Sequence, residues 1–235
     1  MNPVTRLPLH PSRGDILTAD ASLETVRPIH LLKIDASPRA SKSNSIALTD
    51  TFVTAYTDAL PSVTVDVMNV WDEKLPEFDN AAIDAKYKGV AGSAMNEAET
   101  VVWNRIQALV ARFKRADRIV LGVPMWNFAY PYKLKQLIDL VSQRNMLFTY
   151  DGERFGPLLQ TPRAMVIYTR GQEYKEDLPT PPSRFDHQSG YVEFWLHFVG
   201  VPDVRALAVE NTWGDKAEAS MRAAREKVAA LAKEF

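Results

Sequence analysis

Residues 122–128 carry the side chains best suited to holding a flat ligand. The segment Gly122-Val123-Pro124-Met125-Trp126-Asn127-Phe128 combines an aromatic ring, a thioether and a side-chain amide in a loop stiffened by proline. It follows the apolar run 118–121, and the carboxyl end of a parallel strand is where open α/β sheets bind ligands. Such a loop can lie against a heteroaromatic ring and offer it backbone N–H groups. The alternative is an ordinary strand-to-helix connection in which Trp126 and Phe128 are core residues.

Hydroxyls and cations gather in residues 35–45, just before a predicted helix. Ser37, Ser41 and Ser43 stand there with Arg39 and Lys42. A helix N-terminus attracts anions because its first N–H groups are unsatisfied and its dipole end is positive, so this segment suits a phosphate. It contains no glycine, which disfavours a nucleoside triphosphate on a Walker loop and a dinucleotide on a Gly-x-Gly-x-x-Gly turn. The alternative is a plain helix cap, although a cap needs only one or two of these hydroxyls.

A third candidate loop, Thr169-Arg170-Gly171, follows the apolar run 164–169. In a parallel sheet it should lie beside residues 124–128, so that both loops flank one planar ring. Gly171 would let the backbone approach that ring closely, and Arg170 could stabilise an anionic ring edge. The alternative is a simple turn with a solvated arginine.

Chemistry carried by the protein's own nucleophiles or metals has little support. The chain has no cysteine and no Gly-x-Ser-x-Gly elbow, and its four histidines do not form a metal-spaced pair. No metal site is therefore expected. These exclusions favour a bound cofactor as the source of chemistry.

The three loops are positioned by an alternation of strands and helices. Apolar patterns predict strands at 29–34, 63–67, 118–123, 164–169 and 203–209, with a short extra strand at 146–150. Helices are predicted at 45–60, 95–116, 131–144 and 189–199 and along the C-terminal segment that carries Met221, Ala224, Val228 and Leu231. Residues 70–94 form a polar and aromatic excursion with at most one helical turn. This order predicts an α/β, doubly wound, five-stranded parallel sheet of flavodoxin-like type, with strand order 2-1-3-4-5. Residues 1–28 are expected to be an N-terminal extension, and 29–235 one domain.

Composition excludes several classes of partner. The 235-residue chain has a net charge of -1 and a pI of about 6.4, which argues against nucleic acid or an anionic membrane. No apolar run is long enough to span a bilayer, and the N-terminus lacks a secretory signal. With no cysteine, a cytoplasmic location is the simplest prediction.

Together these motifs resemble the FMN-dependent NADH-azoreductase and NAD(P)H:quinone oxidoreductase family over about residues 29–233. The resemblance rests on residues 37–44, on Pro124–Phe128 followed by Leu134–Asp139, on Phe148–Tyr150, and on Thr169–Gly171. The resemblance implies an FMN site with three parts. The phosphate would be held by Ser37, Ser41, Lys42 and Ser43. The ring would be lined by Pro124, Met125, Trp126, Asn127 and Phe128, and its pyrimidine side would be covered by Thr169, Arg170 and Gly171. Asn127 would bond the polar edge of the ring, and Tyr150 is a candidate substrate contact.

The activity implied is transfer of two electrons from NADH or NADPH to a quinone, azo or nitroaromatic acceptor by ping-pong kinetics. A homodimer is expected by resemblance and because the excursion carries more apolar side chains than a free loop needs: Trp71, Leu75, Phe78 and Tyr87. The family more often has Tyr at the position of Trp126 and a second Gly at that of Gln172. Two alternatives remain: a flavodoxin-like electron carrier without turnover, disfavoured by the near-neutral charge, and a cofactor-free interaction scaffold.

Overall fold

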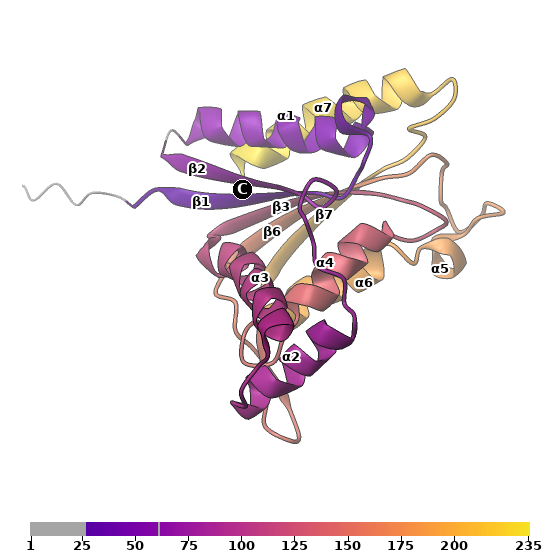
Figure 1. The fold of residues 1–235 in the computed structure, drawn as a ribbon. Helices are drawn as coiled ribbons and strands as arrows, with labels where there is room; N and C mark the ends of the chain where they lie inside the picture. The colour runs from indigo at the N-terminus through magenta and orange to yellow at the C-terminus, as the bar shows by residue number, and fades with distance from the viewer. Residues whose placement is uncertain (1–26, 61) are drawn as a thin grey trace, which may run out of the picture.

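A parallel sheet forms the centre of the molecule, and helices cover both of its faces (Figure 1). The computed structural model describes residues 27–60 and 62–235. The strands of the sheet are β1 (Ile29–Asp35), β2 (Val63–Asn69), β3 (Arg118–Pro124), β6 (Arg163–Thr169) and β7 (Asp203–Val209). They run in the order β2-β1-β3-β6-β7, and every neighbouring pair is parallel. The predicted fold class and strand order are confirmed.

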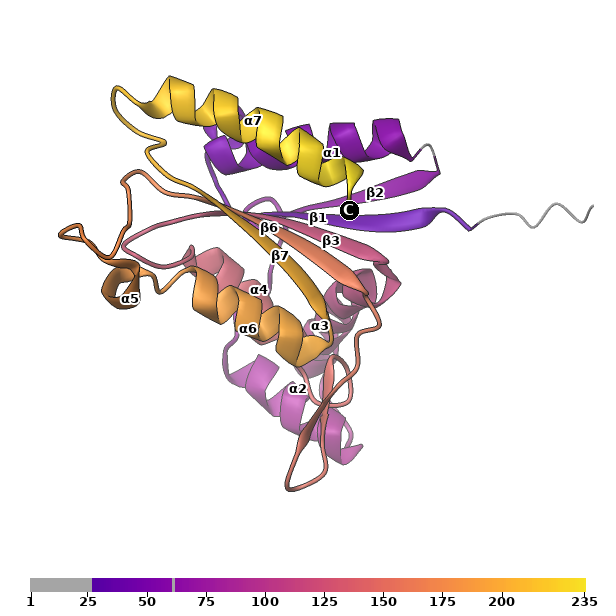
Figure 2. The same ribbon diagram turned by 180° about the vertical axis from the view of Figure 1, so that it is seen from behind.

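The helices divide between the two faces of the sheet (Figures 1 and 2). On one face lie α1 (Asn44–Ala59) and α7 (Ala217–Lys233). The other face is covered by α3 (Glu97–Arg115), α4 (Tyr132–Val141) and α6 (Ser189–Val199), with α2 (Asn80–Ala91) packed on the outside of α3. Short helical turns occur at η1 (Ala40–Lys42) and α5 (Pro182–Phe185).

The central strands are rich in apolar residues because both of their faces are buried. Leu31 packs into the core beneath α1 and α7, whereas its neighbour Leu32 packs into the core on the α3 side. Val120 and Leu121 of β3 divide between the two cores in the same way. The sheet is therefore packed between two hydrophobic layers, which fix the positions of its strand ends.

The prediction of at most one helical turn in residues 70–94 was wrong. Helix α2 has 12 residues, begins at the Asp79 cap and ends at Gly92, whose φ of 68° is left-handed. Its buried side chains include Ala82 and Ala85, and such small residues give a weak apolar stripe. A hairpin of β4 (Phe148–Tyr150) and β5 (Phe155–Pro157) extends the short strand predicted at 146–150.

The apolar side chains of the excursion are mostly used within the chain. Leu75 is buried, and Trp71 and Phe78 pack partly buried against the core, whereas Tyr87 remains 68% exposed. This finding weakens the excursion as the basis for a predicted dimer. The predicted extension at 1–28 lies, apart from Arg27 and Pro28, outside the described residues. Within those residues, no helix combines the length and apolarity that crossing a membrane requires.

Candidate functional site

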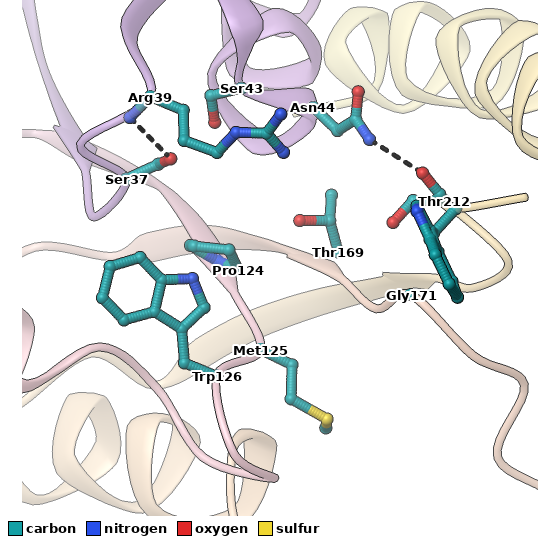
Figure 3. A pocket seen from close by; sticks show the side chains of 11 residues that line it. Ser37, Arg39, Ser43, Asn44, Pro124, Met125, Trp126, Thr169, Gly171 and Thr212 are labelled. Atoms are coloured by element: carbon teal, nitrogen blue, oxygen red, sulfur yellow. Dashed lines mark hydrogen bonds between the residues drawn. The ribbon is translucent and has the colours of Figure 1, made fainter.

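A cavity of about 240 Å³ opens at the carboxyl edge of the sheet (Figure 3). The segments that follow β1, β3, β6 and β7 converge on it. Its lining residues are Ser37, Arg39, Ser43, Asn44, Pro124, Met125, Trp126, Thr169, Gly171, Thr212 and Trp213. Figure 3 shows Ser37, Arg39 and Ser43 along one side of the cavity and Trp126 with Met125 along another. All three predicted loops therefore meet at one site, together with a fourth that follows β7.

The polar end of the cavity is the N-terminus of α1. Ser43 caps this helix, its hydroxyl accepting a hydrogen bond from the Ile46 N–H at 3.3 Å. The N–H groups of Asn44 and Ser45, in the first turn, have no acceptor within the helix. Arg39 lines the same end, and its own N–H donates to the Ser37 hydroxyl at 3.3 Å. Positive charge, free N–H groups and hydroxyls together form a place for an anion.

An ionic network built on the buried pair of Lys33 and Asp35 fixes this end of the sheet to α1. The Lys33 ammonium lies 2.6 Å from the Asp35 carboxylate and 2.7 Å from that of Asp50. The Thr49 hydroxyl donates to the other Asp35 oxygen at 3.0 Å. Burial raises the pKa of Asp35, and the opposing influence of Lys33 and Thr49 does not cancel that rise. The network holds the start of α1 above the end of β1.

Gly122 lets α1 lie directly on β3. A Cβ atom at this position would stand 2.9 Å from the Thr49 methyl group and 3.0 Å from the Ser45 carbonyl oxygen. Any larger residue would push away the first turn of α1, and with it the polar end of the cavity. The signal was present in the sequence, because a glycine within a strand indicates close approach of another segment.

The aromatic wall stands on a tight turn. Trp126 and Ala129 exchange both backbone hydrogen bonds, at 2.8 and 3.0 Å. Between them Asn127 and Phe128 have φ values of 47° and 70°, as a type I′ turn requires. Both residues are exposed, and the Phe128 ring packs at a tilt against Phe185 with ring centroids 5.2 Å apart. Neither lines the cavity, so the loop presents Pro124, Met125 and Trp126 to it.

Trp71, from the excursion, supports Trp126 from behind. The two indole rings have centroids 5.7 Å apart, and the Trp71 ring also meets Tyr132 edge-on at 5.3 Å. Its N–H donates to the Ala36 carbonyl oxygen at 3.0 Å. Trp71 therefore joins the loops after β1, β2 and β3, so that Trp126 is held both by its own turn and by the Trp71 ring.

The loop after β6 is joined to the loop after β3 as predicted. The Met125 N–H donates to the Thr169 carbonyl oxygen at 2.8 Å, and Pro124 pairs with Thr169 in the sheet register. Thr169 and Gly171 line the cavity. A Cβ atom on Gly171 would find only the Trp213 Cβ within contact distance, at 3.8 Å, so space remains above this backbone.

Arg170 points away from the cavity and into a buried polar cluster. Its guanidinium lies 2.6 Å from the Asp186 carboxylate and 3.5 Å from that of Glu210, and its Nε donates to the Gln188 side chain at 3.1 Å. Tyr174 lies beneath the guanidinium at 5.5 Å. If Arg170 contacted an anionic ring edge, as predicted, that contact would have to compete with its bonds to Asp186, Glu210 and Gln188. In this structure Arg170 fastens the Pro-rich segment 172–188 to the sheet.

Asp186 is the centre of that cluster. Besides Arg170 it binds the Ser189 N–H at 2.9 Å, the Ser189 hydroxyl at 2.6 Å and the Gln188 N–H at 3.0 Å. Burial alone would raise the pKa of Asp186, but the Ser189 hydrogen bonds and the Arg170 charge outweigh burial and lower it. The carboxylate is thus held charged at the start of α6.

The predicted site residues separate into two groups. Those that line the cavity are Ser37, Ser43, Pro124, Met125, Trp126, Thr169 and Gly171, whereas Ser41, Lys42, Asn127, Phe128, Arg170 and Tyr150 do not. Ser41 and Lys42 are exposed on η1. Tyr150 stacks on Phe155 at 4.7 Å in the β4–β5 hairpin, which is attached to the C-terminal end of α6 at the opposite edge of the sheet.

The cavity is also lined by three residues that were not predicted to belong to the site: Thr212, Trp213 and Asn44. The turn residues Asn211 and Gly214 after a predicted strand were the available signal, since every strand end at this edge is a potential ligand contact. Arg39 had been associated with the anion loop, and it is the cation that lines the cavity.

The cavity fits a flavin mononucleotide by the chemistry of its donors. The free N–H groups at the start of α1 and the Arg39 cation suit a phosphate, while Trp126 and Met125 offer apolar surface to a ring. The open space over Gly171 leaves room for that ring beside the backbone. Both ends needed for such a ligand lie in one cavity.

Comparison with known proteins identifies the class. A family model described as a flavodoxin-like fold matches residues 30–232. Over 207 residues the chain is 56% identical to FMN-dependent NADH:quinone oxidoreductase 2 of Burkholderia lata, covering 88% of this chain and 100% of the relative. It is 40% identical to FMN-dependent NADH:quinone oxidoreductase 3 of Pseudomonas fluorescens, covering 87% of this chain and 96% of the relative.

Solved structures agree with this assignment. The azoreductase of Bacillus anthracis superposes with a TM-score of 0.80 at 26% identity, covering 88% of this chain and 100% of the azoreductase. The fold and site thus define a flavodoxin-like oxidoreductase. More particularly, the chain belongs to the family of FMN-dependent NADH:quinone oxidoreductases and azoreductases, and the predicted resemblance is confirmed.

Proposed function

We propose that this protein is an FMN-dependent oxidoreductase that transfers two electrons from NADH or NADPH to quinones, azo compounds or nitroaromatics. The proposal rests on one observation: the anion site at the start of α1 and the wall formed by Met125 and Trp126 line the same cavity. FMN matches both ends in one molecule. When bound, it supplies the two-electron chemistry that the side chains themselves cannot supply.

The residues of the chain would bind and orient this cofactor. Ser37, Ser43 and Arg39 would hold the phosphate, together with the N–H groups of Asn44 and Ser45. Trp126 and Met125 would lie against the ring, and the Gly171 backbone would allow close approach on another side. Because Trp71 and the sheet register hold these walls, little reorganisation accompanies binding.

The phosphate assignment is tested with riboflavin, which has the ring but lacks the phosphate. Titration of apoprotein, followed by flavin fluorescence, should show far weaker binding of riboflavin than of FMN. Substitution of Arg39 by Gln should weaken FMN binding and leave riboflavin binding unchanged. Equal affinity of the wild type for the two flavins would refute the assignment.

Enzymatic turnover distinguishes this function from that of an electron carrier. The purified FMN-loaded protein should oxidise NADH when a quinone is added and no other protein is present, whereas a carrier would need a reductase. One site serving donor and acceptor in turn predicts parallel double-reciprocal plots of initial rate. A panel of quinones, azo dyes and nitroaromatics, tested under the same conditions, would rank the acceptors.

We further propose a homodimer in the cytoplasm, with its interface on α6 and the β4–β5 hairpin. Phe194 is 61% exposed and Phe155 is 62% exposed. They belong to a run of aromatic contacts in which both rings meet Phe198, at 5.9 and 5.6 Å. Since Tyr150 lies far from the cavity of its own chain, any contact it makes with substrate would be in the site of a second copy.

Two surface substitutions separate this interface from the one first predicted on the excursion. Phe194→Glu should convert a dimer to a monomer in light scattering if α6 forms the interface, whereas Tyr87→Glu on α2 should leave the mass unchanged. Both side chains are exposed, at 61% and 68%, so neither change should unfold the chain. A wild-type protein that is monomeric and fully active would exclude the dimer.

A further inference from the structure

Trp213 is a large aromatic side chain left open to solvent at the edge of the cavity. It lies between β7 and α7 and is 76% exposed, the highest value among the exposed large hydrophobic side chains of the described residues. The same side chain lines the cavity that holds Ser37 and Trp126. Exposed indole surface next to a cavity is the arrangement expected of a ligand contact rather than of a core residue.

The exposure of Trp213 is not the result of a loosely attached loop. The preceding residue, Thr212, donates to the Arg170 carbonyl oxygen through both its N–H, at 3.0 Å, and its hydroxyl, at 2.9 Å. The Asn44 side chain donates to the Thr212 carbonyl oxygen at 3.2 Å, as Figure 3 shows. The backbone at Trp213 is therefore fixed to the loops after β1 and β6.

The size of the cavity gives a reason for an aromatic group at its edge. Its volume of about 240 Å³ lies below the range of about 300–1,000 Å³ that is usual for ligand pockets. A cofactor with a tricyclic ring, a ribityl chain and a phosphate cannot be enclosed there completely. The part that projects must lie against the rim, where Gly171 leaves open space beside Trp213.

We propose that Trp213 is a further cofactor-binding residue, whose indole packs against the planar ring of bound FMN. This inference rests on the proposed function, since it takes FMN as the ligand. Trp126 and Trp213 then contact the ring from two different loops, after β3 and after β7. The contact with Trp213 therefore adds to the affinity for the flavin ring, and this contribution does not depend on the phosphate.

This last property makes the proposal testable with two flavins. Trp213→Ala should weaken both FMN and riboflavin, each by about tenfold, because an aromatic contact to the ring is lost. Trp213→Phe should restore most of the affinity. Arg39→Gln, which acts on the phosphate, should weaken FMN alone. Tyr87→Ala, on α2, serves as a control for loss of an exposed aromatic ring and should change neither.

Fluorescence gives a second readout that does not depend on turnover. FMN binding should quench less tryptophan emission in Trp213→Phe than in the wild type, because one contacting indole is missing. Unchanged affinity for both flavins in Trp213→Ala would overturn the inference while leaving the proposed function intact, and so would a raised KM for NADH or quinone with unchanged flavin affinity. Failure of the wild type itself to bind FMN would overturn both.

Discussion

Replacement of Arg170 by Met separates two roles for this side chain. As a contact to the flavin edge, Arg170 would influence the reduction potential of the cofactor. As a link to Asp186, Gln188 and Glu210, it would instead hold segment 172–188 in place. The geometry favours the second role, because the Arg170 side chain is only 5% exposed and its guanidinium is already paired with Asp186, Glu210 and Gln188.

The magnitude follows from what the substitution leaves behind. Removing one member of a buried ion pair costs about 3–5 kcal/mol, because the remaining charge is left uncompensated. Asp186 keeps its hydrogen bonds from Ser189 and Gln188, so we expect the lower end, about 3 kcal/mol. For a domain of this size, each kcal/mol shifts Tm by about 2–4 °C, which gives a decrease of about 6–12 °C.

The assay combines melting curves of apoprotein with limited proteolysis of the 172–188 segment. Arg170→Met should lower Tm as calculated and expose this segment to cleavage, and Arg170→Lys, which keeps the charge without the forked geometry, should lie between it and the wild type. The KM for the acceptor should rise more than the dissociation constant of FMN. A Tm within 1–2 °C of wild type (about half a kcal/mol), together with a shifted flavin potential, would refute the link and restore the flavin-edge role.

Three other substitutions test neighbouring features. Asp186→Asn should destabilise the protein at neutral pH. Because folding lowers the pKa of Asp186, the stabilisation it provides is lost as pH falls through the folded-state pKa, so the melting temperatures of variant and wild type should begin to converge below about pH 4 and meet only below that lowered pKa. Asn127→Gly keeps the left-handed turn and removes an amide that does not line the cavity, so stopped-flow reduction by NADH should proceed at close to the wild-type rate; a several-fold slower rate, equivalent to about 1 kcal/mol for one hydrogen bond, would instead show that the amide bonds the ring. Trp126→Ala should weaken FMN retention in dialysis while the apoprotein melts near the wild-type temperature, and equal loss of Tm with and without FMN would make Trp126 a core residue instead.

The sheet and the strand-end loops were predictable because they depend on local signals. Apolar runs of five to seven residues fix the strands, and the alternation with helices fixes their parallel order. The pairing of Pro124 with Thr169 follows from that order, so two of the loops could be expected side by side. Helix α2 was missed because alanine gives little contrast between its faces.

The destinations of individual side chains were less predictable because they depend on partners far along the chain. Arg170 meets Asp186 and Glu210, which are 16 and 40 residues away. Trp71 was predicted to belong to an apolar dimer surface. In the structure its indole donates a hydrogen bond to Ala36 and its ring packs against Trp126. Neither pairing has a pattern in the sequence that would distinguish it from an ordinary charged or aromatic residue.

The left-handed residues of the cavity loops have a consequence for how this protein can change by selection. Ala40, Asn127, Phe128 and Asn211 all have positive φ, although none is glycine. Left-handed backbone costs an ordinary L-residue about 1–2 kcal/mol, and glycine almost nothing. Compared with glycine, these side chains also limit the conformations that the loops can adopt when they are unfolded or partly open. The loops therefore hold the shape of the cavity before a ligand binds. Selection for heat resistance without FMN should therefore enrich glycine at positions 40 and 128, and the resulting proteins should retain the cofactor less well.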